Sequence, residues 1–173
     1  MVMSICSPLA VMAYDFSAVA PSGQTLYYNI ISDSTVEVTS QNSSSPYYSD
    51  GGPVGTLVIP DTVTNPNTGI IYNVESIGDY AFKNCDNLTS VTIPNSITTI
   101  GTETFANCFQ LSTIEFGNAV ISIGYRSFYE CYSLTNIIFP ESLITIGENA
   151  FGQDANLTSI TLPSSLTTIE DYA

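Results

Sequence analysis

The sequence contains no histidine and almost no basic residues. Without histidine it lacks the commonest general base and the commonest metal ligand of proteins. Its two basic side chains, Lys83 and Arg126, stand against sixteen acidic ones, which gives a net charge of −14. Two cations cannot form the positive patch that DNA, RNA or an anionic membrane surface requires. The composition therefore predicts no nucleic-acid partner.

Long apolar runs are absent as well, so no segment is predicted to insert into a membrane. The apolar stretch at the N-terminus, residues 1–13, is too short to span a bilayer. Val11 and Ala13 fit the −3 and −1 positions of a signal-peptidase site, although the usual basic residue at the front is missing. We interpret residues 1–13 as a shortened signal peptide; an ordinary first strand or an exposed tail is the alternative.

The motifs of common enzymes are missing too. There is no G-x-S-x-G elbow, and a Ser–His pair is impossible without histidine. The acidic residues are scattered, which does not indicate the paired carboxylates of a glycosidase. The sequence predicts that this chain is not an enzyme and that it needs no cofactor.

What the sequence does contain is a repeat. The segment SIGDYAF at 76–82 returns as TIGTETF at 99–105, SIGYRSF at 122–128 and TIGENAF at 145–151. Successive copies begin 23 residues apart. A fixed period of this length is typical of a solenoid, in which each coil buries its apolar face against its neighbours. The positions that recur with this period include Ile77, Ile100, Ile123, Ile146 and Ile169; Phe82, Phe105, Phe128 and Phe151; and Leu88, Leu111, Leu134 and Leu157.

Each repeat divides into a strand and a corner. In the segment that begins at Leu88, Val91 and Ile93 alternate with polar residues, as in a strand with one buried face. Gly78 and its equivalents would permit a tight bend, and the recurring Phe would fill the corner. The spacing of three between Phe and Cys suits a short helical or 3-10 turn. The predicted fold is a mainly β solenoid of 23-residue coils with such turns.

The segment LTSVTIPNSITTIGTETFANC at 88–108 resembles the BspA-like, treponemal-type leucine-rich repeats of bacterial cell-surface proteins. The resemblance covers residues 74–173, with Asp154 where the pattern has Cys and Glu170 where it has Gly. It implies a leucine-rich repeat solenoid in a secreted or cell-surface adhesin. Its partners would be host extracellular-matrix or mucosal proteins or other cell surfaces, and its location extracellular.

The chain divides into three predicted parts. After the signal peptide, residues 14–73 form a β-rich N-terminal cap that ends in a degenerate first repeat. Pro60 and Pro94 take equivalent positions but are farther apart than one period, so this repeat carries an insertion, expected at 64–73 as a small hairpin or loop. Residues 74–173 form about four and a half coils, the last one incomplete. We interpret the chain as a piece of a longer protein, and the repeats of a larger extracellular enzyme, with its catalytic domain beyond residue 173, are the alternative.

A ladder of cysteines follows the phenylalanines. Its members are Cys85, Cys108 and Cys131, and Asp154 takes the next position. Stacked thiols with parallel side chains have poor disulfide geometry, and no C-x-x-C pair or histidine accompanies them. The ladder therefore predicts small apolar packing residues rather than a metal or redox site. Asp154 in the same position indicates that this corner is near solvent or hydrogen-bonded.

Candidate ligand-binding residues come from the outward positions of the strands. In a leucine-rich repeat these positions line one continuous face, although they could equally be ordinary polar strand residues. The outward residues are Ser90, Thr92, Thr113, Glu115, Asn136, Ile138, Ser159 and Thr161. A second candidate is the patch of Tyr125, Arg126 and Tyr129, since aromatic residues and arginine are enriched at binding hot spots. These three could also be coil-edge residues that cover the core.

Overall fold

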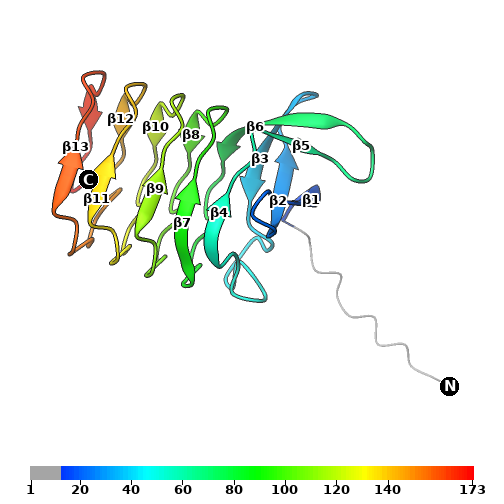
Figure 1. The fold of residues 1–173 in the computed structure, drawn as a ribbon, viewed down its shortest axis with the longest axis horizontal. Coiled ribbons are helices and arrows are strands. Elements are labelled where there is room, and N and C mark those ends of the chain that lie inside the picture. Colours follow the sequence, from blue (N-terminus) through cyan, green and yellow to red (C-terminus); the bar gives the residue numbers. More distant parts are fainter. Residues whose placement is uncertain (1–12) are drawn as a thin grey trace.

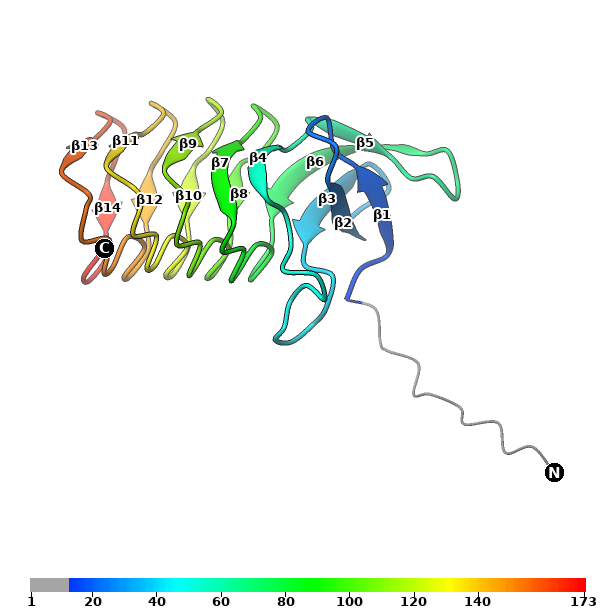
Figure 2. The same ribbon diagram turned by 60° about the horizontal axis from the view of Figure 1, so that its bottom comes forward.

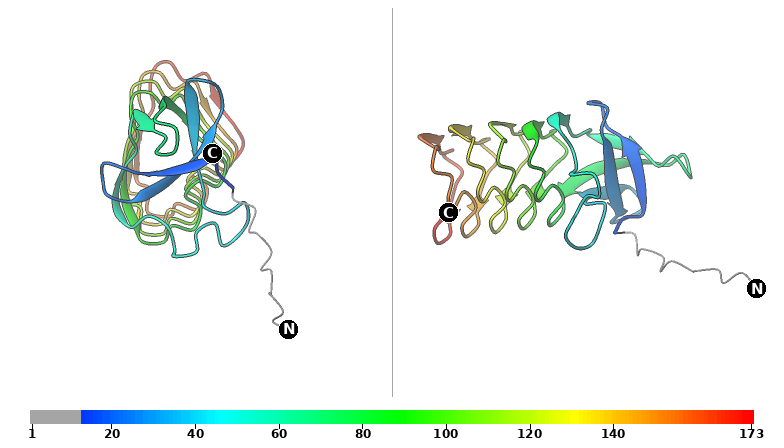
Figure 3. Two further views of the ribbon diagram at one scale, coloured as in Figure 1. Left: turned by 90° about the vertical axis from the view of Figure 1, so that its right-hand side faces the viewer. Right: turned by 90° about the horizontal axis from the view of Figure 1, so that it is seen from below.

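The computed structural model describes residues 13–173, so all of the predicted signal peptide except Ala13 lies outside the described residues. The described chain is a row of stacked coils with a strand-rich cap at its N-terminal end (Figure 1). Viewed along the stack, the coils superimpose into one outline (Figure 3). Between residues 13 and 173 no helix is long and apolar enough to cross a membrane.

Each coil contributes one strand to each of two walls. One wall is a nine-stranded sheet in the order β1-β2-β3-β6-β8-β10-β12-β14, with β5 paired to β6. Its strands are β1 (Phe16–Val19), β2 (Thr25–Ile30), β3 (Thr35–Thr39), β5 (Thr62–Thr64), β6 (Ile71–Ile77), β8 (Thr99–Ile100), β10 (Ser122–Ile123), β12 (Thr145–Ile146) and β14 (Thr168–Ile169).

The second wall consists of two shorter parallel sheets, β4-β7-β9 and β11-β13. From β7 onward its paired residues are equivalent positions of consecutive repeats, as in Val91 with Ile114 and Ile137 with Ile160. Its strands are β4 (Gly55–Val58), β7 (Leu88–Thr92), β9 (Thr113–Glu115), β11 (Asn136–Ile138) and β13 (Ser159–Thr161). The predicted solenoid is therefore confirmed, and this register is consistent with the predicted 23-residue coil.

The cap is continuous with the solenoid. β1, β2 and β3 form an antiparallel meander, and β3 then pairs in parallel with β6, the first long strand of the coils. Leu26, Tyr28, Val36 and Val38 are fully buried from the meander and belong to the same apolar cluster as the repeats. The meander thus covers the apolar edge of the first coil.

The segment 64–73, for which the sequence predicted a hairpin or loop, lies in an antiparallel hairpin of β5 and β6. Thr62 pairs with Asn73 and Thr64 with Ile71. The N–H of Gly69 donates to the carbonyl of Asn65 (2.8 Å) and closes the turn. The hairpin projects from the cap end of the stack (Figure 2).

A column of phenylalanine rings runs through the corner of the solenoid. Phe82, Phe105 and Phe128 are fully buried and Phe151 is 7% exposed. Successive ring centroids lie 5.1, 5.2 and 5.2 Å apart, and the rings are within 18° of parallel. Each ring removes its neighbours from water, so the column stabilises every coil through the next one.

The corners themselves contain no helix among the described residues, so the predicted helical turn is replaced by a run of tight turns. Tyr80 and Asn84 have left-handed backbone angles (φ 59° and 63°). Cys85 N–H donates to Phe82 three residues back (3.2 Å), but Phe82 N–H donates to Thr104 in the next coil (2.8 Å). A helix would direct both N–H groups into its own turn. The hydrogen bond from Phe82 to the next coil is therefore incompatible with a helical turn at this corner.

The glycine that precedes each corner was predicted to permit a tight bend, but the structure gives it a different role. Gly78, Gly101, Gly124 and Gly147 are absent from the left-handed region, so a tight bend does not explain them. A Cβ on Gly124 would lie 2.8 Å from the carbonyl carbon and oxygen of Gly101. These glycines allow consecutive coils to approach each other closely at this point.

We predict that Phe128→Ala destabilises the fold by about 3–5 kcal/mol, the usual loss for a buried phenylalanine. The measurement is urea-induced unfolding followed by circular dichroism. The matched control is Phe109→Ala, because Phe109 also stacks on an aromatic neighbour, Tyr132, at 5.4 Å but is 37% exposed. Equal losses in the two variants would show that the buried column is not what stabilises the coils.

Candidate functional site

The predicted outward residues of the strands all lie on the solvent side of the second wall. Ser90 and Thr92 are half-buried and the other six are exposed. Their register places Ser90 beside Thr113 and Thr92 beside Glu115, and the Thr92 hydroxyl donates to Glu115 Oε2 (3.1 Å). Farther along the stack, Asn136 pairs with Ser159 and Ile138 with Thr161. We call this surface of eight residues the strand face.

The strand face is not one continuous sheet, because the described chain shows no strand pairing between β9 and β11. A groove of about 340 Å³ lies there, lined by Ser112, Thr113, Ile114, Thr135, Asn136 and Ile138. Ile138 is 65% exposed. Three of the predicted ligand-binding residues, Thr113, Asn136 and Ile138, therefore meet around this groove.

The Tyr125, Arg126 and Tyr129 patch lies elsewhere, in the turn that follows β10. The Arg126 guanidinium carbon is 5.0 Å from the ring centroid of Tyr125 and 4.7 Å from that of Tyr129. All three side chains are half-buried. The guanidinium is thus held on two tyrosine rings, and the patch does not belong to the strand face.

Lys83 occupies a similar environment that sequence reasoning missed. Its Nζ lies 5.9 Å from the ring centroid of Tyr47 and 5.3 Å from that of Tyr80, and it forms an ion pair with Glu103. The Tyr47 and Tyr80 rings stack on each other at 5.4 Å. A cation over an aromatic face is attracted by the negative potential of that face. No sequence pattern indicated this contact, because Tyr47 comes from the cap.

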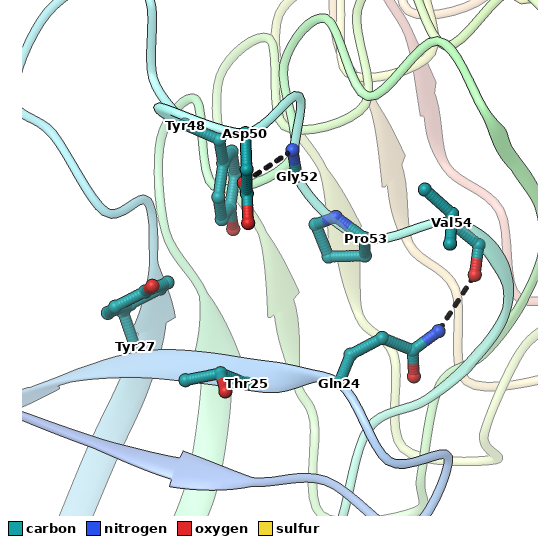
Figure 4. A pocket seen from close by; sticks show the side chains of 8 residues that line it. All are labelled: Gln24, Thr25, Tyr27, Tyr48, Asp50, Gly52, Pro53 and Val54. Atoms are coloured by element: carbon teal, nitrogen blue, oxygen red, sulfur yellow. Dashed lines mark hydrogen bonds between the residues drawn. The ribbon is translucent and has the colours of Figure 1, made fainter.

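A pocket of about 200 Å³ lies between β2 and the segment 48–54, and Figure 4 shows its walls. The lining residues are Gln24, Thr25, Tyr27, Tyr48, Asp50, Gly52, Pro53 and Val54. The Tyr27 and Tyr48 ring centroids are 5.9 Å apart with their planes at 58°. Sequence reasoning missed this pocket because it took its candidate residues from the repeats, and the pocket lies in the cap.

Hydrogen bonds hold the pocket walls in place. The Tyr48 hydroxyl donates to the carbonyl of Ala81 (2.7 Å), and burial raises the pKa of this phenol well above its ordinary value. Gly52 N–H donates to Asp50 Oδ1 (3.1 Å). Gly52 has φ +75°, and a Cβ there would lie 2.6 Å from Cys85 Sγ and 2.9 Å from the Tyr48 ring. Only glycine lets the loop lie this close to the tyrosine.

The cysteine ladder packs as predicted. Cys85, Cys108 and Cys131 are free thiols with no exposed surface. The Cys108 thiol donates to the carbonyl of Phe82 (3.2 Å) and the Cys131 thiol to that of Phe105 (3.3 Å). Burial raises the pKa of all three thiols, so they are neutral packing groups with low reactivity.

Asp154 continues this ladder with a carboxyl group that is hydrogen-bonded, as predicted, but buried rather than near solvent. Its Oδ1 accepts from the Cys131 N–H (2.6 Å), and its Oδ2 has no partner among the described residues. Burial raises the pKa of Asp154 to about 8, with a smaller contribution from Glu130; the bond from Cys131 opposes this rise. Below this pKa the Asp154 carboxyl is neutral, like the buried cysteine thiols that take this position in the preceding coils.

Comparison with known proteins fits these features. A family model described as BspA type leucine rich repeat region matches residues 56–173 in six copies. The chain belongs to the BspA-type leucine-rich repeat proteins. The match begins before residue 74, so it includes part of the segment that the sequence analysis assigned to the cap. Repeat proteins of this kind have extended surfaces suited to protein–protein interaction.

Three solved structures of bacterial leucine-rich repeat proteins are similar to this one. A leucine-rich repeat protein from Bacteroides ovatus has a TM-score of 0.71 and 31% identity, over 90% of this chain and 37% of that one. The T. pallidum leucine-rich repeat protein has a TM-score of 0.67 and 24% identity, over 94% and 63%. A leucine-rich cell surface protein from Faecalibacterium prausnitzii has a TM-score of 0.59 and 24% identity, over 91% and 45%.

The chain spans less than two thirds of each of these three proteins. The last two likenesses, at 24% identity, show the fold alone. No curated protein matches the chain. The match of the family model to residues 56–173 confirms the predicted family.

We predict that Asp154 makes the fold less stable as pH rises. Its pKa is about 8 in the folded chain against 3.8 ordinarily, so the folded state holds the proton more tightly. Its contribution is complete below about pH 3.8 and is lost as pH rises through about 8. Between about pH 5 and pH 8.5 we expect Asp154→Asn to lose less unfolding free energy than the natural chain, by up to a few kcal/mol.

Urea unfolding at the two pH values provides the measurement. The control is Asp86→Asn, which removes an exposed carboxyl and should retain the natural pH dependence. Identical pH dependence in Asp154→Asn and the natural chain would mean that Asp154 is ionised in the fold.

Proposed function

We propose that this chain is the ligand-binding part of a secreted or cell-surface bacterial adhesin. Its ligands would be host extracellular-matrix or mucosal proteins, or other cell surfaces. The BspA-type repeats, the F. prausnitzii relative described as a cell surface protein and the signal-peptide pattern of residues 1–13 support this location. We further propose residues 14–73 as the cap and 74–173 as the repeat region that carries the binding surface.

The observation that carries the proposal is the groove between β9 and β11 on the strand face. It offers hydroxyl and amide groups from Thr113, Thr135 and Asn136 beside the exposed side chain of Ile138. Polar groups around an apolar contact are typical of protein recognition surfaces. The stacked strands hold these side chains in fixed register, so a partner meets a rigid surface whose ordering costs little entropy.

A second candidate function is that of an accessory module, in which the repeats target or space a catalytic domain of a larger extracellular enzyme. Its support is that the chain covers only 37%, 63% and 45% of the three similar structures, so proteins with these repeats contain additional segments. The adhesin proposal is preferred because the groove itself offers a binding surface.

We predict that Thr113→Lys combined with Glu115→Lys weakens capture of the ligand about tenfold or more, because two long cations replace the surface beside the groove. Surface plasmon resonance against a panel of purified matrix proteins and mucins provides the measurement. The control is Thr62→Lys with Glu75→Lys, which changes the charge equally on the exposed β5–β6 hairpin. If both double variants bind a panel member as the natural chain does, the strand face is not the binding surface.

A further inference from the structure

Both basic side chains of this protein lie against pairs of tyrosines. Lys83 contacts Tyr47 and Tyr80 and pairs with Glu103, and Arg126 contacts the rings of Tyr125 and Tyr129. The Lys83 site is the fuller one, because it joins two rings, a carboxylate and an ammonium group. In this site two tyrosine rings and a carboxylate hold a primary ammonium group.

The pocket beside β2 presents the same groups without a cation of its own. Tyr27 and Tyr48 form a corner of two tilted rings, and Asp50 provides the carboxylate (Figure 4). Lys83 and Arg126 are the only basic side chains in the sequence, and neither lines this pocket. Two tyrosine rings and a carboxylate thus line a space of about 200 Å³ into which neither Lys83 nor Arg126 reaches.

Three polar side chains of the pocket, those of Gln24, Tyr48 and Asp50, have no free donor. Gln24 Nε2 already donates to the carbonyls of Val54 (2.8 Å) and Thr56 (3.0 Å), and Gln24 Oε1 is buried without a partner among the described residues. Asp50 uses Oδ1 for Gly52 N–H, which leaves Oδ2 available. The Tyr48 hydroxyl donates outside the pocket, to Ala81. A primary ammonium has three donors and no acceptor, so it complements this set.

We propose that this pocket binds a primary alkylammonium group, supplied by a lysine side chain of a partner protein. The volume admits a single side chain and is smaller than the roughly 300–1,000 Å³ of drug-sized sites. The net charge of −14 attracts basic partners over the whole surface, and the pocket then selects one ammonium from them. The site lies on the cap, so it does not depend on the strand face.

The direct test uses a lysine side chain as the probe. Nα-acetyl-lysine methylamide is titrated into the 15N-labelled chain, and the amide signals of Asp50 and Gly52 are followed. We expect saturable shifts that weaken as salt is added, because the attraction is partly electrostatic. The norleucine analogue, which lacks the charge, should leave these signals unchanged. The Nε-trimethyl analogue should bind more weakly, since it has no N–H to donate.

Two variants locate the binding. Asp50→Asn removes the charge but keeps an acceptor for Gly52 N–H, and we expect it to weaken lysine binding by roughly tenfold or more. Tyr27→Leu, which removes one ring, should also weaken it. Asp33→Asn removes an exposed carboxylate away from the pocket and should bind as the natural chain does. The proposal fails if Asp50→Asn binds lysine unchanged, if norleucine binds as tightly, or if no saturable shift occurs at low salt.

Discussion

The repeat region depends on each coil lying in register on the one before it. The N–H of Phe82 bonds to Thr104, and the phenylalanine rings stack at 5.1–5.2 Å. A coil with one residue more or fewer would lose both contacts at once. This is why the apolar positions recur with a fixed period from residue 74 onward. It is also why the N-terminal meander matters, since the first coil has no preceding coil to cover it.

This register made the fold predictable from the sequence. A core position of one coil recurs in the next, so Phe82 and Phe105 could be assigned to the interior by period alone, and both are fully buried. The backbone conformation of the corner turns was harder to predict from the sequence. The left-handed angles at Asn84 and Asn107 had a signal, because asparagine tolerates them, but Tyr80 and Arg126 adopt them without one. Because backbone angles cannot be read from the repeat pattern, the sequence also predicted a tight bend at Gly78 and its equivalents. The structure shows instead that these glycines allow close contact between coils.

The candidate surfaces were predictable only where they follow the repeat. The outward direction of Thr113 and Glu115 follows from strand alternation, whereas the interrupted pairing between β9 and β11 does not. The cap pocket was invisible to sequence reasoning because β2 and the loop with Tyr48 meet through long-range contacts that no period describes. Asp154 lies between these cases: its position in the ladder was evident, but its burial depends on how tightly the corner packs.

The acidic composition and the tyrosines together leave the surface with few free positive charges. With a net charge of −14 and both basic side chains already held on tyrosine rings, the described surface offers almost no free cation to an acidic partner. Its field therefore favours basic ligands over the whole molecule but discriminates poorly between them. Discrimination requires short-range contacts, and the strand groove and the cap pocket are the two places proposed for them. Both are built from the stacked coils or packed against them, so the register that stabilises the fold also positions these two proposed recognition surfaces.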